Sequence, residues 1–179
     1  MAALPNKMVV YVLLHLVLFT SASYSTTIQV TDQNNQPLAN AVVELTLHKV
    51  PSAPLKHSDS PFVMDQINKA FVPHVLLVNK NSLISFPNSD DIRHHVYSFS
   101  EPKKFEIKLY ADTPEQPILF DEPGIVVLGC NIHDSMSGYI FVSPWDDNQF
   151  TNELGRVEFS GVEVTPGLVV WHPGLLNPS

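Results

Sequence analysis

Three side chains that bind soft metal ions recur at every third position in one late segment of the sequence. Cys130 supplies a thiol, His133 an imidazole and Met136 a thioether, within the stretch from Gly129 to Gly138. Thiolate and thioether are soft donors and imidazole is intermediate. Together they select copper over magnesium, calcium or manganese. The segment therefore predicts a mononuclear copper site.

A copper site of this kind is completed by a second imidazole, giving two His, one Cys and a weak axial Met. His94 and His95 offer it, where the polar turn from Asn88 to Arg93 leads into a strand. Adjacent residues of a strand point to opposite faces, so only one of the two imidazoles can reach the late loop. Hydrophobic alternation around the pair does not decide between them.

Short β-branched and apolar runs recur along the chain, and helical periodicity is absent after the first residues. Two of these runs, 125–128 and 139–142, flank the predicted ligand loop and would hold its side chains at fixed distances. The spacing predicts an all-β sandwich. The expected strands lie at residues 27–30, 41–47, 75–78, 82–86, 96–99, 104–109, 118–120, 125–128, 139–142, 157–159 and 168–171.

The first 25 residues have the pattern of a secretory signal peptide. Lys7 precedes an apolar run from Met8 to Phe19, and a small, polar stretch ends at Ser25. An apolar run of this length is shorter than the roughly 20 residues that span a bilayer. We expect cleavage after Ala22 or Ser25 and no membrane anchor in the mature chain.

Composition limits the partners and the role of the cysteine. The formal net charge of the chain is −8, which makes nucleic acid and anionic lipid poor partners. Cys130 is the single cysteine of the 179 residues, so it cannot form an intramolecular disulfide. An inert buried thiol or an intermolecular bridge are the alternatives to metal binding.

The late loop resembles the cupredoxins, small copper proteins with a Greek-key β-sandwich, and its Cys-x-x-His-x-x-Met spacing is that of amicyanin. A closer resemblance is to exported bacterial proteins often named methylamine utilisation proteins. It rests on Phe71-Val72-Pro73, Phe86-Pro87-Asn88, His94-His95-Val96-Tyr97-Ser98 and Leu128-Gly129-Cys130-Asn131-Ile132-His133-Asp134. The resemblance implies a periplasmic, non-enzymatic protein that carries single electrons between redox partners. It also implies that His94, rather than His95, is the ligand beside Cys130, His133 and Met136.

A second resemblance, to carboxypeptidase-regulatory-like sandwiches of the transthyretin type, involves both ends of the mature chain. It implies one small sandwich interrupted by the copper module. The expected borders are 26–60 for its first part, 61–145 for the copper domain and 146–179 for its closing strands. The motifs that carry it are Ile28-Gln29-Val30-Thr31-Asp32, residues 36–45, Gly155-Arg156-Val157-Glu158-Phe159, Pro166-Gly167 and residues 169–173.

Other functions remain open from the residues alone. One is a periplasmic copper carrier or store. Another is a catalytic site, with Cys130 and His133 as a nucleophile pair or with an open copper position. A third is an interaction module without catalysis. Asp90 and Asp91 are expected to shape the turn before His94 through side-chain to backbone hydrogen bonds, and not to act as acid or base.

Overall fold

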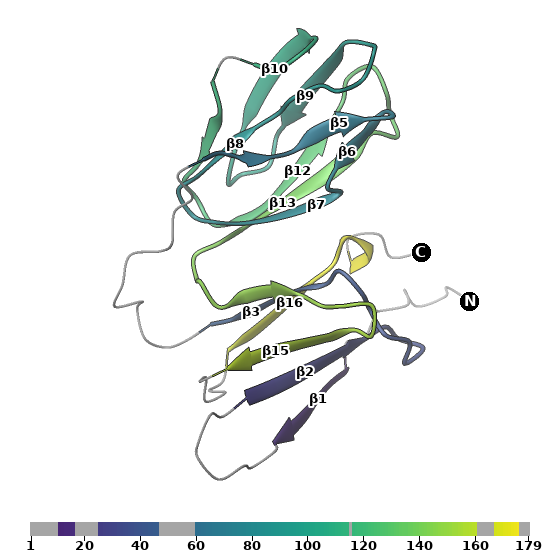
Figure 1. The fold of residues 1–179 in the computed structure, drawn as a ribbon, viewed down its shortest axis with the longest axis vertical. Coiled ribbons are helices and arrows are strands. Elements are labelled where there is room, and N and C mark those ends of the chain that lie inside the picture. Colours follow the sequence, from purple (N-terminus) through teal and green to yellow (C-terminus); the bar gives the residue numbers. More distant parts are fainter. Residues whose placement is uncertain (1–10, 17–24, 47–59, 115, 161–166, 176–179) are drawn as a thin grey trace, which may run out of the picture. The chain divides into compact units, whose positions relative to one another are not determined.

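The computed structural model shows an all-β chain, as the sequence predicts (Figure 1). It describes residues 11–16, 25–46, 60–114, 116–160 and 167–175. Within these ranges every element is a strand except a short 3-10 helix at Pro173–Leu175. The described residues contain no helix that is both long and apolar enough to cross a membrane.

The chain divides into two compact units: residues 1–52 with 147–179 form unit 1, and residues 53–146 form unit 2. Unit 1 has two three-stranded sheets, of order β1-β2-β15 and β14-β3-β16. Val43 in β3 pairs with Val170 in β16, so strands from the two ends of the chain share a sheet. The strands of unit 1 are β1 (Tyr11–Leu16), β2 (Ser25–Thr31), β3 (Val42–Leu45), β14 (Asn148–Phe150), β15 (Arg156–Ser160) and β16 (Leu168–Trp171).

Alternating burial explains why unit 1 forms a sandwich. In β2 and β15 every second side chain is buried, which puts one apolar face of each strand toward the core. The buried cluster takes side chains from both sheets. Its members are Ile28, Val30, Ala41, Val43, Leu45, Val157 and Phe159.

Strand β1 belongs to the segment that the sequence predicts to be a signal peptide. Tyr11–Leu16 pairs antiparallel with residues 26–31 of β2. The remainder of the predicted leader, apart from Ser25 in β2, lies outside the described residues. Export and the cleavage position stay predictions.

Unit 2 is a β-sandwich that contains the predicted ligands. Its larger sheet has the order β10-β9-β12-β13-β7, and a smaller sheet has the order β11-β8-β4. One buried cluster takes residues from both sheets, including Ile84 and Phe120 from the smaller one and Val96, Val126 and Ile140 from the larger one. The bounds are β4 (Phe62–Val63), β7 (Val75–Asn79), β8 (Ser82–Ser85), β9 (His94–Ser98), β10 (Phe105–Tyr110), β11 (Ile118–Phe120), β12 (Gly124–Gly129) and β13 (Ser137–Ser143).

A small hairpin adds to unit 2 beside these sheets. It pairs β5 (Asp65–Ile67) with β6 (Ala70–Val72). Its two turn residues, Asn68 and Lys69, have φ angles of 54° and 60°. Two successive left-handed residues match the twist of a two-residue hairpin turn. This hairpin was not among the strands expected from the sequence.

Candidate metal centre

The loop from Cys130 to Met136 is held at both ends by a regular strand ladder. Strands β12 and β13 pair antiparallel, and the ladder closes with Gly129 opposite Ser137. Inside the loop, the Met136 backbone N–H donates to the His133 carbonyl at 2.9 Å, which makes a tight turn. The strand ladder and this turn therefore fix the backbone positions from which the loop side chains extend.

The upstream histidine comes from β9, which lies beside β12 in the larger sheet. The register places Tyr97 of β9 opposite Gly129 of β12, one residue before Cys130. His94 is the first residue of β9, and its side chain is fully buried. The sheet thus brings residue 94 next to residue 130 although they are far apart in the sequence.

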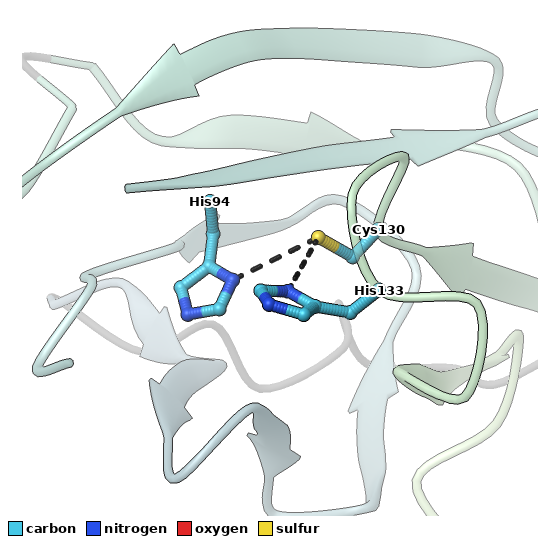
Figure 2. Close-up of side chains that lie close together, drawn as sticks. All are labelled: His94, Cys130 and His133. Atoms are coloured by element: carbon cyan, nitrogen blue, oxygen red, sulfur yellow. Dashed lines mark hydrogen bonds between the residues drawn. The ribbon is translucent and has the colours of Figure 1, made fainter. Parts of the chain in front are cut away.

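Three potential metal donors meet in the interior of unit 2 (Figure 2). The Sγ of Cys130 lies 3.7 Å from Nδ1 of His94 and 3.7 Å from Nδ1 of His133. The donor atoms of these three residues all lie within 4.8 Å of one another. Cys130 and His94 are buried, and His133 is half-buried. The structure therefore brings three of the four predicted ligands together.

The spacing and the donor types fit a metal ion at the centre of the group. Metal bonds are about 2.0 Å long to nitrogen and about 2.3 Å long to sulfur. With an N–metal–S angle of about 120°, the nitrogen and the sulfur lie about 3.7 Å apart. The distances from Cys130 Sγ to both imidazoles have this value. One thiolate and two imidazoles in a trigonal arrangement are the donors of a blue-copper site. The group could bind one copper ion.

Met136, the fourth predicted ligand, lies at the end of the same loop. Its side chain is only 2% exposed and belongs to the same buried cluster as Cys130. A buried thioether beside the thiol can serve as a weak axial donor, and it can also simply fill the core. Its role as a ligand stays a prediction.

The two adjacent histidines point to opposite faces of β9. His94 faces the interior, whereas His95 lies on the outer face with 13% of its side chain exposed. The Nε2 of His95 is 3.0 Å from a carboxylate oxygen of Glu106, without the alignment of a hydrogen bond. His94 is therefore the imidazole that the structure places at Cys130.

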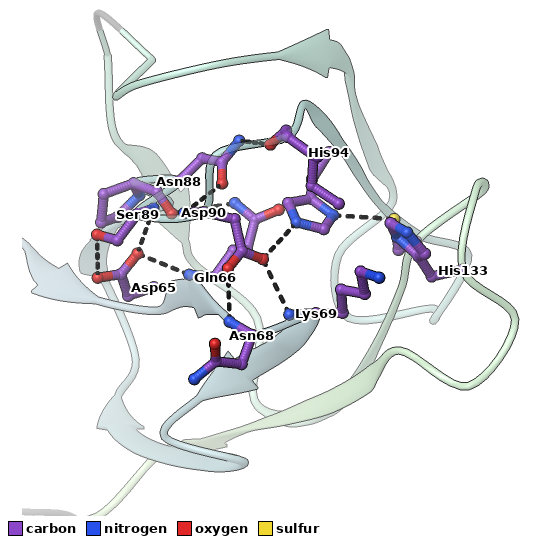
Figure 3. Close-up of polar contacts among 12 residues, drawn as sticks. Asp65, Gln66, Asn68, Lys69, Asn88, Ser89, Asp90, His94 and His133 are labelled. Carbon is purple, nitrogen blue, oxygen red and sulfur yellow. Dashed lines mark hydrogen bonds and ion pairs between the residues drawn. The ribbon is translucent and has the colours of Figure 1, made fainter.

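A carboxylate behind His94 fixes the orientation of its ring (Figure 3). The Oδ2 of Asp90 lies 2.7 Å from His94 Nε2 and also accepts the Lys69 backbone N–H at 2.9 Å. Its Oδ1 accepts the backbone N–H of Asn68. An Nε2–H that donates to a carboxylate leaves the Nδ1 lone pair free to face Cys130.

The pKa of Asp90 follows from these contacts. Desolvation opposes ionisation of the carboxyl. Hydrogen bonds from Lys69, His94 and Asn68 outweigh it, so the pKa lies below its ordinary value. Asp90 shapes the turn, as expected from the sequence, and it also contacts a predicted ligand, His94.

Asn88, one residue of the Phe-Pro-Asn motif, braces the same turn. Its side-chain amide donates to the carbonyls of Ile92 at 2.8 Å and Tyr110 at 3.1 Å. Its Oδ1 accepts the Asp90 backbone N–H at 3.1 Å. The buried amide therefore fixes the path of the chain from Asp90 to His94.

Comparison with known proteins finds similar folds among solved structures. A copper-containing nitrite reductase from Thermus scotoductus SA-01 has a TM-score of 0.43 and 24% identity, over 55% of this chain and 25% of that chain. An oxidised amicyanin variant has a TM-score of 0.43 and 18% identity, over 53% of this chain and 97% of that chain. A purple cupredoxin from Nitrosopumilus maritimus has a TM-score of 0.40 and 19% identity, over 48% of this chain and 100% of that chain.

These likenesses are partial, because the three TM-scores lie between 0.40 and 0.43. The match spans a quarter of the nitrite reductase chain and nearly all of the two small cupredoxins. No protein-family model and no curated protein matches the chain. The methylamine-utilisation subtype suggested by the sequence motifs stays a prediction.

Proposed function

We propose that this chain is an exported, periplasmic copper protein that carries single electrons between redox partners. It holds one copper ion with His94, Cys130, His133 and Met136. The observation that supports this most directly is the separation of 3.7 Å from Cys130 Sγ to each imidazole Nδ1. A bound copper ion supplies a couple between Cu(I) and Cu(II), which exchanges one electron at a time.

The surroundings of the donors favour electron exchange over catalysis. His94 is fully buried, Cys130 is 4% exposed and Met136 is 2% exposed, so solvent has little access to these donor atoms. Four protein donors close the coordination positions of a blue-copper site. Asp90 holds His94 in one tautomer, so the donors need little rearrangement when the charge of the site changes.

A nucleophilic role for Cys130 and His133 has less support. Such a pair needs a third group that orients the base. The contact of this type that the structure describes is made by Asp90, and it goes to His94. Asp134, next to His133 in the sequence, is exposed.

The test is the absorption spectrum of the copper-loaded chain after expression with export. An intense visible band from charge transfer between thiolate and Cu(II), together with reversible one-electron reduction, supports the proposal. Cys130→Ser should lose that band and keep the far-ultraviolet circular dichroism, because a hydroxyl is a hard donor that cannot replace the polarisable thiolate. A colourless protein with tightly bound copper would instead indicate a carrier or store.

A further inference from the structure

The outer face of β9, with the residue that follows the strand, carries a row of three rings. His95, Tyr97 and Phe99 follow one another at every second residue, so they share a face. Ring centroids are 5.9 Å apart for the first pair and 5.1 Å apart for the second. Phe99, at the end of the row, is 79% exposed. Single exposed apolar side chains are ordinary, but a contiguous aromatic row marks an interaction surface.

This row lies against the backbone that leads to the predicted copper ligand. Gly129 immediately precedes Cys130 and pairs with Tyr97 across the sheet. A Cβ on Gly129 would lie 2.7 Å from Cζ and 2.8 Å from the hydroxyl oxygen of Tyr97. The absence of a side chain at this position lets the Tyr97 ring lie on the main chain beside the thiol.

Two hollows flank the ridge formed by Tyr97 and Phe99. One cavity of about 530 Å³ lies on the β12 side and is also lined by Val127, Cys130 and Met136. The other, of about 490 Å³, lies on the β10 side and is also lined by His95, Lys104 and Glu106. A raised aromatic centre between two hollows gives a docking protein a place for its own side chains on both sides.

Among the residues that line the two cavities, two are acidic and one is a lysine. Asp134 lines the first cavity and Glu106 the second. Lys104 also lines the second cavity, but it is ion-paired with Glu101. The formal net charge of the whole chain is −8. A partner with a basic rim is therefore attracted to this face and oriented by it.

We propose that the Tyr97–Phe99 ridge binds a redox protein that has an apolar centre and a basic rim, and that electrons cross there. The inference rests on the proposed electron-carrying function. In each encounter the reduced partner loses one electron and the bound Cu(II) becomes Cu(I). No covalent bond forms or breaks, and no proton is transferred. Tyr97 and the Gly129 backbone provide the packed path between Cys130 and the surface.

The alternative candidate surface is the neighbouring ligand loop around His133. It offers one large exposed apolar side chain among its described residues, Ile132, which is 49% exposed. The neighbouring Met136 is only 2% exposed and adds little apolar surface there. The ridge offers the more exposed apolar side chain, Phe99 at 79%, and the two hollows, and so it is the better docking face.

The test uses cytochrome c, a small basic haem protein, as the probe. Reduced, copper-loaded, nitrogen-15-labelled chain is titrated with reduced cytochrome c at low salt, so that no electron is exchanged, and backbone amide shifts are recorded. We expect the largest shifts at Tyr97, Phe99 and Val127, and their loss at high salt. Shifts centred on Ile132 and Ser135, or the absence of saturable binding, would overturn the proposal.

Variants separate this inference from the proposed function. Phe99→Ser should weaken binding by about tenfold, since loss of a central aromatic anchor costs on the order of 1.4 kcal/mol. Tyr97→Leu should slow electron exchange more than it weakens binding. Leu119→Ser is the control, because Leu119 is 42% exposed in β11 of the smaller sheet. Leu119→Ser should change neither the affinity for cytochrome c nor the rate of electron exchange.

Each variant must keep the visible copper band and the potential of the unmodified chain for its result to count. If the unmodified chain shows no such band, the proposed function is wrong. If the band is present and Phe99→Ser binds cytochrome c as the unmodified chain does, the docking inference alone is wrong.

Discussion

The carboxylate of Asp90 lies 2.7 Å from Nε2 of His94 and also accepts the two turn N–H groups of the β5–β6 hairpin. One side chain therefore connects a predicted copper ligand to a turn more than twenty residues earlier in the sequence. Asn68 and Lys69 both have positive φ angles in that turn, which directs their N–H groups to the same carboxylate. The hairpin thus helps to set the orientation of the His94 ring.

Replacing Asp90 with alanine should weaken copper binding. Without the carboxylate the His94 ring loses its fixed tautomer and orientation, and the loss of such a partner costs about 10- to 100-fold in metal affinity. Competition with a chelator of known affinity measures the change. Asp91→Ala is the matched control, because Asp91 is an exposed neighbour in the same turn. Equal losses in both variants would indicate a general effect of the turn.

The two adjacent histidines should behave differently on substitution. His94→Ala should abolish the intense visible band, because it removes a donor that lies 3.7 Å from Cys130 Sγ. His95→Ala should retain the band, since that side chain lies on the outer face beside Glu106. Absorption and electron paramagnetic resonance spectra of copper-loaded protein distinguish the two results. The reverse outcome would assign the ligand to His95.

Met136→Leu tests the axial position. Leucine has a similar volume, so the buried cluster around Met136 should remain packed. Copper should still bind, and the reduction potential should rise because a weak axial donor stabilises Cu(II) more than Cu(I). Protein-film voltammetry measures the potential. An unchanged potential and spectrum would show that Met136 only fills the core.

Alkaline pH should destabilise unit 2 through Tyr110. Its hydroxyl donates to the Phe86 carbonyl at 2.7 Å and accepts the Gln66 amide. Burial raises the pKa of Tyr110 to about 12. In the unfolded chain the pKa of a tyrosine is about 10. The contribution of Tyr110 to stability is therefore complete below about pH 10 and is lost as the pH rises through about 12.

The measurement is denaturant unfolding at several pH values, for the unmodified chain and for Tyr110→Phe. The free energy of unfolding of the unmodified chain should fall as the pH rises from about 10 to about 12. The free energy of unfolding of Tyr110→Phe should fall less steeply. Parallel pH profiles for the two proteins would show that Tyr110 does not cause the loss of stability at alkaline pH.

Much of the fold could be read from local pattern, because buried strands keep their apolar alternation. The run expected at 118–120 is strand β11, with the same bounds. The hairpin β5–β6 was missed for a local reason. Its turn is Asn68-Lys69, and the usual signal for two left-handed residues is Asn or Asp followed by Gly. Strands of three residues with polar members also give little periodicity.

The candidate site was predictable to different degrees. Cys130 and His133 are close in sequence and lie on one loop, so their spacing alone identified them. The choice of His94 over His95 needed a resemblance, because alternation fits either residue. The contact from Asp90 to His94 depends on the path of a turn that Asn88 holds in place. Sequence spacing contains no information about that path.

The interleaved connectivity of the two units has a consequence for the order in which the chain folds. Strands β2 and β3 are synthesised before residues 53–146, but their partners β14, β15 and β16 come after them. Unit 1 therefore cannot complete its strand pairing until all of unit 2 has been synthesised. Until then β2 and β3 each have an unpaired edge. Unit 2 has all its strands in one uninterrupted stretch and can complete its core first. Folding of the emerging chain then proceeds from the middle outward, with the donors of the candidate metal centre assembled before the strands of unit 1 pair.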